Sequence, residues 1–246
     1  MNRFFTQQPL AVGQAVTLSP EIAKHAVRVL RLDVGAAVEL VDPNAQVFVA
    51  TIEATAPLRV VVASTVATRS ELPIAVQICC GVPKGDKAEL IVQKATELGV
   101  QRVSFYNSQW ATAKWQAPKA DKKLARLQLI AQGAAEQSHR AHIPVVELVS
   151  FQAILAAKAD SKLIAYEKSA KIGETSALVQ AVTQRPQTLV AVFGPEGGIS
   201  PAEITALTAA GFTAAGLGPR ILRTETAPLY LLSAISTLTE LQGENN

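Results

Sequence analysis

The chain has 246 residues with a formal net charge of +3, and 49% of its residues are hydrophobic while 17% are charged. These proportions exclude a disordered chain, because a core of ordinary size can be buried. The apolar runs are strand-sized, well short of the roughly 18 residues that a membrane helix needs. Residues 1–8 lack the apolar segment of a signal peptide, and the adjacent Cys79 and Cys80 give no metal or disulfide spacing. We therefore expect a cytoplasmic protein without a metal site or a membrane partner.

The net charge is not spread evenly along the chain. Residues 1–73 carry 6 basic and 6 acidic side chains, residues 74–142 carry 10 and 5, and residues 143–246 carry 7 and 9. The excess therefore lies in the middle segment, where 10 − 5 = +5. Such regional clustering is typical of a surface that faces a polyanion. A solvated helix face has the same composition, so charge alone does not separate the two.

The first 70 residues are predicted to be mostly β structure. Three Val-rich segments, Ala37–Val41, Val47–Ala54 and Leu58–Val66, are separated by turn-forming residues. Ser19-Pro20-Glu21 supplies an N-cap and a proline at the first helical position, which predicts a helix to about Leu30. Short strands around one helix favour a small barrel.

The pattern changes near residue 72, where Ile74–Val82 begins a continuous apolar run typical of a strand covered on both faces. Strands and helices then alternate, which predicts a parallel α/β sheet. The further strands expected are Val100–Tyr106, Val145–Val149, Leu163–Tyr166, Leu189–Phe193 and Ala214–Leu217. The helices expected are Asp86–Gly99 with Asp86 as its cap, Lys119–Ser138, 151–158, 175–184, 200–211 with a capping box at Ser200 and Glu203, and Thr226–Leu241.

Two glycine-containing segments follow predicted strands directly. Phe193-Gly194-Pro195-Glu196-Gly197-Gly198 would let the backbone approach a ligand closely, although a tight strand-to-helix loop has the same pattern. Pro83-Lys84-Gly85-Asp86-Lys87 places two lysines beside a helix N-terminus, which suits an anion. Both segments are therefore candidate binding loops at strand ends.

The segment 216–227, with the sequence GLGPRILRTETA, begins like the dinucleotide fingerprint G-x-G-x-x-G. However, Ile221 stands where the third glycine belongs, and Pro219 removes a backbone donor from the phosphate cradle. A nicotinamide-dependent enzyme on a Rossmann sheet is thus disfavoured on physical grounds.

The same segment concentrates charge between apolar residues. A solvated loop would not need Ile221 and Leu222, so we expect this segment to be packed. Buried charge needs partners, and Arg220, Arg223 and Glu225 are therefore expected to pair with one another or with a substrate.

Two tryptophans, Trp110 and Trp115, lie in the polar loop Asn107–Pro118. They are suited either to stack on nucleic-acid bases or to plug a surface. His139 and Arg140 close a predicted helix, where they either favour the helix C-terminus or belong to a site. The sequence leaves both pairs of alternatives open.

Taken together, these motifs resemble the RsmE family of 16S ribosomal RNA (uridine-N3) methyltransferases, which belongs to the SPOUT superfamily. The segments that carry the resemblance are Lys84–Lys87, Gln93–Val100, Ala135–Arg140, Gly194–Gly198 and Leu217–Ala227. Arg3-Phe4-Phe5 and His25–Arg31 resemble the family's N-terminal PUA-like barrel. The resemblance covers essentially the whole chain.

The resemblance implies an α/β fold in two domains. Residues 1–72 would form a PUA-like β-barrel that binds RNA, and residues 73–246 a SPOUT methyltransferase domain with a parallel sheet and a deep trefoil knot, an exception to the rule against knots. The implied enzyme is a homodimer. It uses S-adenosylmethionine to methylate N3 of one uridine in the decoding region of 16S ribosomal RNA, on the small ribosomal subunit. The alternative is a non-catalytic RNA-binding ribosome-assembly factor.

The resemblance also assigns residues to roles. The implied cofactor-binding residues are Tyr166, Glu167, Phe193, Gly194, Pro195, Glu196, Gly197, Gly198, Leu217, Gly218, Ile221, Leu222, Arg223, Thr226 and Ala227. A cation would stabilise negative charge on the uracil, and a carboxylate would take its proton or orient an arginine. The catalytic candidates are accordingly Arg223, Glu225 and Arg220, with Glu196 as a second carboxylate. The alternative for Glu225 is a structural role in which it only holds the loops of the knot together. The residues expected to face RNA are Arg3, His25, Arg28, Arg31, Lys84, Lys87, Lys119, Lys122, Lys123, Arg126 and Arg140.

One departure from the family pattern concerns the loop after the second strand of the sheet. The family usually has a Ser-rich stretch with an arginine there, whereas this chain has Asn107-Ser108-Gln109-Trp110. A phosphate contact from this loop is therefore in doubt, and Lys114 is the nearest basic residue.

Overall fold

The structure is a computed structural model, which describes residues 1–167 and 176–241. The chain divides into two compact units. The N-terminal unit comprises Met1–Glu71 together with Ala135–His142, and the C-terminal unit comprises Leu72–Ala134 and Ile143–Asn246. A boundary near residue 72 does not anticipate that Ala135–His142 belongs to the N-terminal unit.

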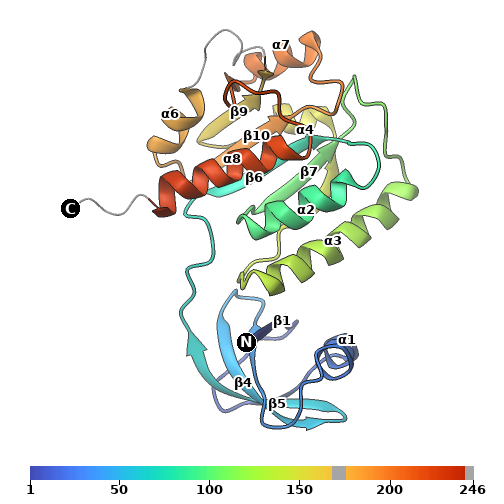
Figure 1. Cartoon of the computed structure of the whole chain (residues 1–246), viewed down its shortest axis with the longest axis vertical. Helices are drawn as coiled ribbons and strands as arrows, with labels where there is room; N and C mark the ends of the chain where they lie inside the picture. Colours follow the sequence, from blue (N-terminus) through green and yellow to red (C-terminus); the bar gives the residue numbers. More distant parts are fainter. Residues whose placement is uncertain (168–175, 242–246) are drawn as a thin grey trace, which may run out of the picture. The chain divides into compact units, whose positions relative to one another are not determined.

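A five-stranded sheet forms the N-terminal unit (Figure 1). Its hydrogen-bonded order is β1 (Asn2–Phe5), β3 (Ala37–Val41), β4 (Val47–Thr55), β5 (Leu58–Val66) and β2 (Ala15–Thr17). β1 pairs with β3 in parallel, and the other pairs are antiparallel. Alternating residues such as Leu40, Ile52 and Val60 fill the core, which explains why the three Val-rich segments were recognisable as strands.

The helix of this unit starts as predicted. The Ser19 side chain accepts a hydrogen bond from the Ile22 backbone N–H at 3.3 Å, and Pro20 begins α1 (Pro20–Ala23). The helix continues as a π-helical segment, η1 (Lys24–Val29), and the chain then turns at Arg31, whose φ is 55°. β1 and β2 were not predicted individually, because strands of 4 and 3 residues are too short for a periodic pattern.

Two arginines that were expected to face RNA are buried in this unit instead. The Arg140 side chain is 2% exposed and binds the Glu71 carboxylate, which also accepts the backbone N–H groups of Ala141 and His142. Arg3 is likewise buried and forms an ion pair of 2.9 Å with Glu39. Charged groups that are buried and paired in this way hold the unit together, so the RNA-facing role expected of them is corrected.

The C-terminal unit is built on a six-stranded sheet in which every strand pairing is parallel. Its order is β11 (Thr213–Ala215), β9 (Ser161–Ala165), β10 (Thr188–Phe193), β6 (Ala75–Gly81), β7 (Arg102–Tyr106) and β8 (Val145–Val149). The helices are α2 (Lys87–Glu97), α3 (Lys119–Gln137), α4 (Phe151–Leu155), α6 (Ala177–Thr183), α7 (Pro201–Ala209) and α8 (Thr226–Ser236), the last continued by the π-helical η2 (Thr237–Leu241).

Helices cover both faces of this sheet. On one face, Ile91 of α2, Leu127 of α3 and Leu232 of α8 pack against the sheet in a single hydrophobic core. Residues of α6 belong to the same core. Ile154 of α4 and Leu207 of α7 pack on the opposite face. Figure 1 shows α2, α3 and α8 side by side over the sheet. Burial on both faces explains why the strands read as continuous apolar runs.

The strand order places a crevice at the middle of the sheet. β6, β7 and β8 run outward from β10 in one direction, whereas β9 and β11 lie on its other side. In open parallel sheets, ligands bind beyond the carboxyl ends of the strands where the order reverses direction. The loops that follow β6, β7, β9, β10 and β11 all leave from that edge.

A few predicted details differ from the structure or remain predictions. Asp86 precedes α2 but makes no side-chain capping bond; its backbone carbonyl accepts the Glu89 N–H instead, at 3.0 Å. Residue 175, the first of the predicted helix 175–184, lies outside the described residues. The trefoil knot and the functional domain boundary remain predictions. None of the helices within residues 1–167 and 176–241 combines the length and apolar character required to cross a membrane.

Replacing Arg140 tests how much its buried ion pair contributes to the stability of the fold. Arg140→Ala leaves the Glu71 carboxylate without its cation, and we expect the free energy of unfolding in urea to fall by about 2–3 kcal/mol. The control is Arg59→Ala, because the Arg59–Glu53 pair is solvated, with side chains 54% and 43% exposed. That control should lose less than about 1 kcal/mol. Equal losses in the two variants would contradict the assignment.

Candidate active site

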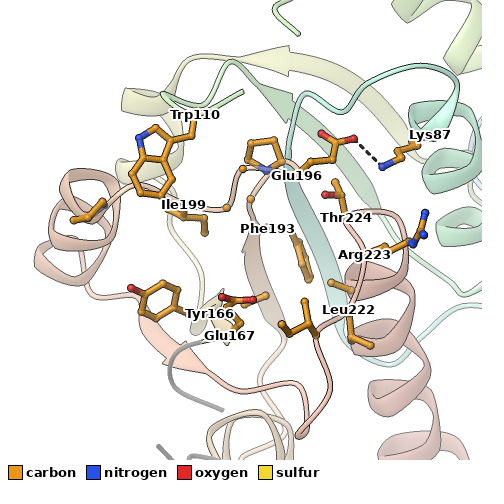
Figure 2. Close-up of a pocket in the computed structure, with 18 residues that line it drawn as sticks. Lys87, Trp110, Tyr166, Glu167, Phe193, Glu196, Ile199, Leu222, Arg223 and Thr224 are labelled. Carbon is orange, nitrogen blue, oxygen red and sulfur yellow. Dashed lines mark hydrogen bonds and ion pairs between the residues drawn. The ribbon is translucent and has the colours of Figure 1, made fainter. Parts of the chain in front are cut away.

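A cavity of about 500 Å³ lies at the carboxyl edge of the C-terminal sheet. Its walls come from the loops that follow β7, β9, β10 and β11 and from the start of α2, as Figure 2 shows. The lining residues are Lys87, Trp110, Ala165, Tyr166, Glu167, Phe193, Gly194, Pro195, Glu196, Gly197, Gly198, Ile199, Pro201, Ile221, Leu222, Arg223, Thr224 and Ala227. This is the position that the reversal of strand order predicts for a ligand site.

The glycine-rich loop after β10 needs its glycines for two different reasons. A Cβ atom on Gly194 would lie 2.7 Å from the backbone carbon of Gly198, so the loop could not close with a side chain there. Gly198 has a φ of +78°, which other residues rarely adopt. A Cβ on Gly198 would meet no protein atom within 4 Å, although the residue lines the cavity. The space beside Gly198 is therefore room for a ligand.

The far end of this loop is fixed by a capping box. The Ser200 side chain accepts the Glu203 backbone N–H at 3.2 Å, and Glu203 accepts the Ser200 N–H at 2.9 Å. The buried Glu203 carboxylate also accepts hydrogen bonds from the Ser108 hydroxyl and the Gln109 backbone N–H, at 3.2 and 2.9 Å. The capping box was predicted, but its second use as an anchor for the loop after β7 was not.

Lys87 lies between two carboxylates at the edge of the cavity. Its ammonium group donates a hydrogen bond to Glu196 at 2.8 Å and lies 3.3 Å from Glu225 (Figure 2). Glu196 also accepts the Lys84 backbone N–H at 3.1 Å. The lysine segment, the glycine-rich loop and the start of α8 are thus joined by one cluster of charges. Lys87 was expected to face RNA, whereas the structure places it in the wall of the cavity.

The hydrogen bond between Lys87 and Glu196 favours the charged forms of these two residues. Burial raises the pKa of Glu196, but the hydrogen bonds from Lys87 and from backbone N–H groups outweigh it, so the pKa lies below the ordinary 4.5. The hydrogen bond to Glu196 raises the pKa of Lys87 above 10.5, against a smaller opposing effect of burial. The ion pair therefore stabilises the fold fully between about pH 4.5 and 10.5. This stabilisation is lost as the pH falls through the lowered pKa of Glu196. It is also lost as the pH rises through the raised pKa of Lys87.

The loop after β11 does not pack as the sequence suggested. Ile221 is 71% exposed, and both Arg220 and Arg223 are exposed as well. Within the part of the chain that the structure describes, neither arginine takes part in an ion pair, and Glu225 pairs with Lys87 instead. The alternative in which these three charges pair with one another is thus wrong, and the alternative in which they pair with a substrate stays a prediction. The two arginines remain available to a ligand.

Most residues assigned to the cofactor line one of two adjoining cavities. Tyr166, Glu167, Phe193–Gly198, Ile221–Arg223 and Ala227 line the larger one. Leu217, Gly218 and Arg220 line a neighbouring cavity of about 90 Å³, which shares Tyr166, Glu167, Ile221, Leu222 and Ala227 with the larger. Thr226 and Glu225 line neither. Sequence reasoning named Trp110 only as a candidate for stacking on bases and missed Ala165, Ile199, Pro201 and Thr224, which lie at the end of β9 or in the segments that follow β10 and β11.

The two tryptophans of the loop after β7 have different surroundings. Trp115 is 8% exposed, lies 4.8 Å from the Phe105 ring between centroids, and is covered by the Lys123 ammonium at 4.9 Å. The Asn107 side chain bonds the Trp115 backbone N–H and carbonyl, at 2.9 and 2.8 Å. Trp110 is 48% exposed and lines the cavity. One tryptophan therefore plugs the surface, and the other stands at the site.

The remaining basic residues differ in how freely they face solvent. Lys84, Lys119, Lys122, His25, Arg28 and Arg31 are exposed. Arg126 is exposed and pairs with Glu89 at 3.0 Å, while Lys123 is engaged with Trp115. Exposed cations of this kind can contact phosphates, and their role toward RNA stays a prediction.

Potential metal ligands and cysteine thiols were located among the residues that the structure describes. No group of three or more His, Cys, Asp or Glu side chains within residues 1–167 and 176–241 could hold a metal ion. Cys79 and Cys80 are both buried, and burial raises the pKa of Cys79 to about 12. Its thiol therefore stays protonated near neutral pH.

Removing the Lys87 ammonium should change the titration of Glu196. In Lys87→Met we expect the pKa of Glu196 to rise, because its strongest charged partner is lost, and we expect faster amide hydrogen exchange in the glycine-rich loop. Carboxyl titration by NMR and hydrogen exchange measure these effects. Lys84→Met is the matched control, since Lys84 reaches Glu196 only through its backbone N–H. Identical titrations in the two variants would refute the role given to the ammonium group.

Comparison with known proteins agrees with this geometry. A family model described as RNA methyltransferase domain matches residues 70–236, and one described as RNA methyltransferase PUA domain matches residues 18–62. The chain is 41% identical over 253 aligned positions to ribosomal RNA small subunit methyltransferase E of Bacillus subtilis, with 98% of each chain covered. A 35% identical relative from Mycobacterium tuberculosis, aligned over 67% of this chain and 63% of its own, carries the same name.

Solved structures give the same result. The crystal structure of a ribosomal RNA small subunit methyltransferase E from Neisseria gonorrhoeae, bound to S-adenosylmethionine, is 30% identical with a TM-score of 0.86, and the match covers 97% of this chain and 98% of the other. A Legionella pneumophila structure described as a methyltransferase with bound S-adenosylmethionine is also 30% identical, with a TM-score of 0.85 and 96% of each chain covered. Because the match spans nearly the whole chain and includes both units, the chain belongs to the ribosomal RNA small subunit methyltransferase E (RsmE) family of RNA methyltransferases.

Proposed function

We propose that this chain transfers a methyl group from S-adenosylmethionine to N3 of one uridine in the decoding region of 16S ribosomal RNA, on the small ribosomal subunit. The observation that carries the proposal is the cavity at the carboxyl edge of the sheet. Its walls unite the glycine-rich loop, the loop after β11 and Lys87, which are the segments that resemble the family.

The cavity fits a cofactor of this kind. Its volume of about 500 Å³ lies in the usual range for small-molecule sites. The open space beside Gly198 would accept a ligand against the backbone, and Phe193 and Leu222 provide apolar walls. When bound, S-adenosylmethionine supplies a methyl group that its sulfonium already activates. Tyr166, Glu167 and the glycine-rich loop would hold it.

The protein must then prepare the uridine. N3 carries an imide proton and is a poor nucleophile until that proton leaves, and base pairing hides it in a duplex. The site must therefore hold an unpaired uracil with N3 in line with the methyl carbon and accept one proton.

The geometry divides these tasks among the charged residues. Arg223 lines the cavity without a carboxylate partner among the described residues, so its guanidinium can stabilise negative charge on O2 or O4 of the uracil. Of the two carboxylates held by Lys87, Glu196 lines the cavity and Glu225 does not. We therefore assign Glu196 the contact with the N3 proton and Glu225 the positioning of Lys87. Arg220, on the smaller cavity, is left to cofactor binding.

RNA binding would use both units. The N-terminal unit presents the exposed His25 and Arg28 on η1 and the exposed Arg31 just after it. The C-terminal unit presents Lys84 and the start of α3 with Lys119 and Lys122. The match of residues 18–62 to an RNA methyltransferase PUA domain supports this assignment.

We also propose that two chains form a homodimer. The exposed Ile221 and the half-exposed Tyr230 of α8 leave apolar surface beside the site. Exposed apolar side chains can contribute to a contact between two protein chains. The proposed partner is a second copy of the chain.

The decisive experiment is methylation of small-subunit particles and of naked 16S RNA with labelled S-adenosylmethionine, followed by mapping of the modified base. Incorporation at N3 of a single uridine is expected. A ribosome-assembly factor without catalysis would bind the particles but transfer no label. In the same assay, Arg223→Ala should lose at least about a hundredfold in rate, as removal of a charge-stabilising donor does. It should still bind the cofactor in calorimetry, and normal methylation by this variant would refute its role.

Neutralising the exposed lysines at the start of α3 should weaken binding of the particle. For Lys119→Gln/Lys122→Gln we expect lower affinity and a slope of log K against log salt that is shallower by about 1.5, because each phosphate contact contributes slightly less than one. Lys158→Gln is the control, since Lys158 is exposed but lies in the segment without excess positive charge. An unchanged slope would assign these lysines to an ordinary solvated surface.

A further inference from the structure

Trp110 is a large aromatic side chain left open to solvent at the mouth of a binding cavity. It is 48% exposed and lines the larger cavity, whereas Trp115 of the same loop is buried. Within the described part of the chain, no ring pair and no cation–π contact includes Trp110. Its indole face is therefore available to a planar ligand.

The backbone on both sides of Trp110 is held in place. The preceding Gln109 N–H and Ser108 hydroxyl are bound to the buried Glu203 carboxylate. A Cβ on Gly197 would lie only 2.8 Å from the Trp110 carbonyl oxygen, so the glycine-rich loop packs directly against this residue. A fixed backbone presents the indole with little loss of conformational freedom on binding.

The indole lies at a defined end of the cavity. Figure 2 shows Trp110 and Tyr166 on one side, with Lys87 and Arg223 on the other. Of the cofactor-binding residues implied by the resemblance, Leu217 and Gly218 line only the smaller cavity, which Trp110 does not line, whereas Tyr166 lines both. Because 48% of Trp110 is exposed, its outer face is left for a second ligand.

The charge around the loop favours a nucleic-acid strand as that ligand. Past Trp110 the chain carries exposed Lys114, Lys119 and Lys122, and Asp121 is the one acidic residue between positions 107 and 123. Cations that follow a stacking aromatic are the usual arrangement for single-stranded nucleic acid, because the ring binds a base and the lysines bind phosphates.

We propose that Trp110 is the stacking platform for an unpaired base of the substrate RNA. The inference rests on the proposed function and deepens it, since it names a side chain that holds the RNA beside the cofactor. In this chain a stacking contact stands in the loop where an arginine was expected, so an aromatic face replaces the phosphate contact of that arginine, and the lysines that follow supply the contacts with phosphates.

The test compares Trp110→Ala and Trp110→Phe with the wild type and with Val179→Ala, a change at an exposed apolar residue of α6 that lines neither cavity. We expect Trp110→Ala to raise the KM for small-subunit particles about tenfold, as loss of one base-stacking contact does. Trp110→Phe should restore most of this loss, and Val179→Ala should match the wild type. The Kd of S-adenosylhomocysteine in calorimetry should stay unchanged in all three variants.

A second measurement uses the fluorescence of the indole itself. Adding a uridine-containing oligonucleotide to wild-type protein saturated with S-adenosylhomocysteine should quench a signal that Trp110→Phe lacks. Quenching by S-adenosylhomocysteine alone, or a matching rise in its Kd in Trp110→Ala, would assign the ring to the cofactor and overturn the inference. A wild-type KM in Trp110→Ala would also overturn it. Failure of the wild type to methylate ribosomal RNA would instead refute the proposed function.

Discussion

The ammonium group of Lys87 joins three segments that lie far apart in the sequence. It binds Glu196 from the glycine-rich loop and Glu225 from the start of α8, and its own backbone begins α2. Each of these segments leaves the sheet from a different strand, so nothing local keeps their ends together. Two carboxylates from separate segments thus share one ammonium group. The position of the cavity thus depends on a tertiary ion cluster as much as on the strands.

The strands and helices were largely predictable, since their signals are local. Ser19 and Ser200 cap helices as their neighbours in sequence indicate, and Leu58–Val66 matches its predicted bounds. Tertiary partners were not predictable in the same way. Glu203 was recognised as half of a capping box, but nothing in the sequence shows that its carboxylate also anchors the loop after β7. Most buried polar atoms are hydrogen-bonded, and the donor to a buried carboxylate can come from anywhere in the chain.

The charge composition of a segment does not predict which of its basic residues are exposed. Arg140 and Lys122 are both part of the positively charged middle segment, yet Arg140 is buried against Glu71 while Lys122 stays exposed. The difference comes from position in the fold: Ala135–His142 belongs to the N-terminal unit, where Arg140 meets a carboxylate 69 residues away. Regional charge therefore overstates the surface available to RNA, and the free cations of the C-terminal unit concentrate at Lys84 and the start of α3.

The loop after β7 holds two tryptophans whose environments are set by different tertiary contacts. Its two tryptophans are equivalent in composition, but Asn107 fastens the backbone of Trp115 and lets that ring enter the core beside Phe105. Glu203 and the glycine-rich loop fix the chain before and beside Trp110, whose ring stays half-exposed at the cavity. An indole kept out of the core at such a place gains stability only when a ligand covers it. The loop without the expected arginine is therefore organised from within the protein, and its free aromatic face is the part left for recognition.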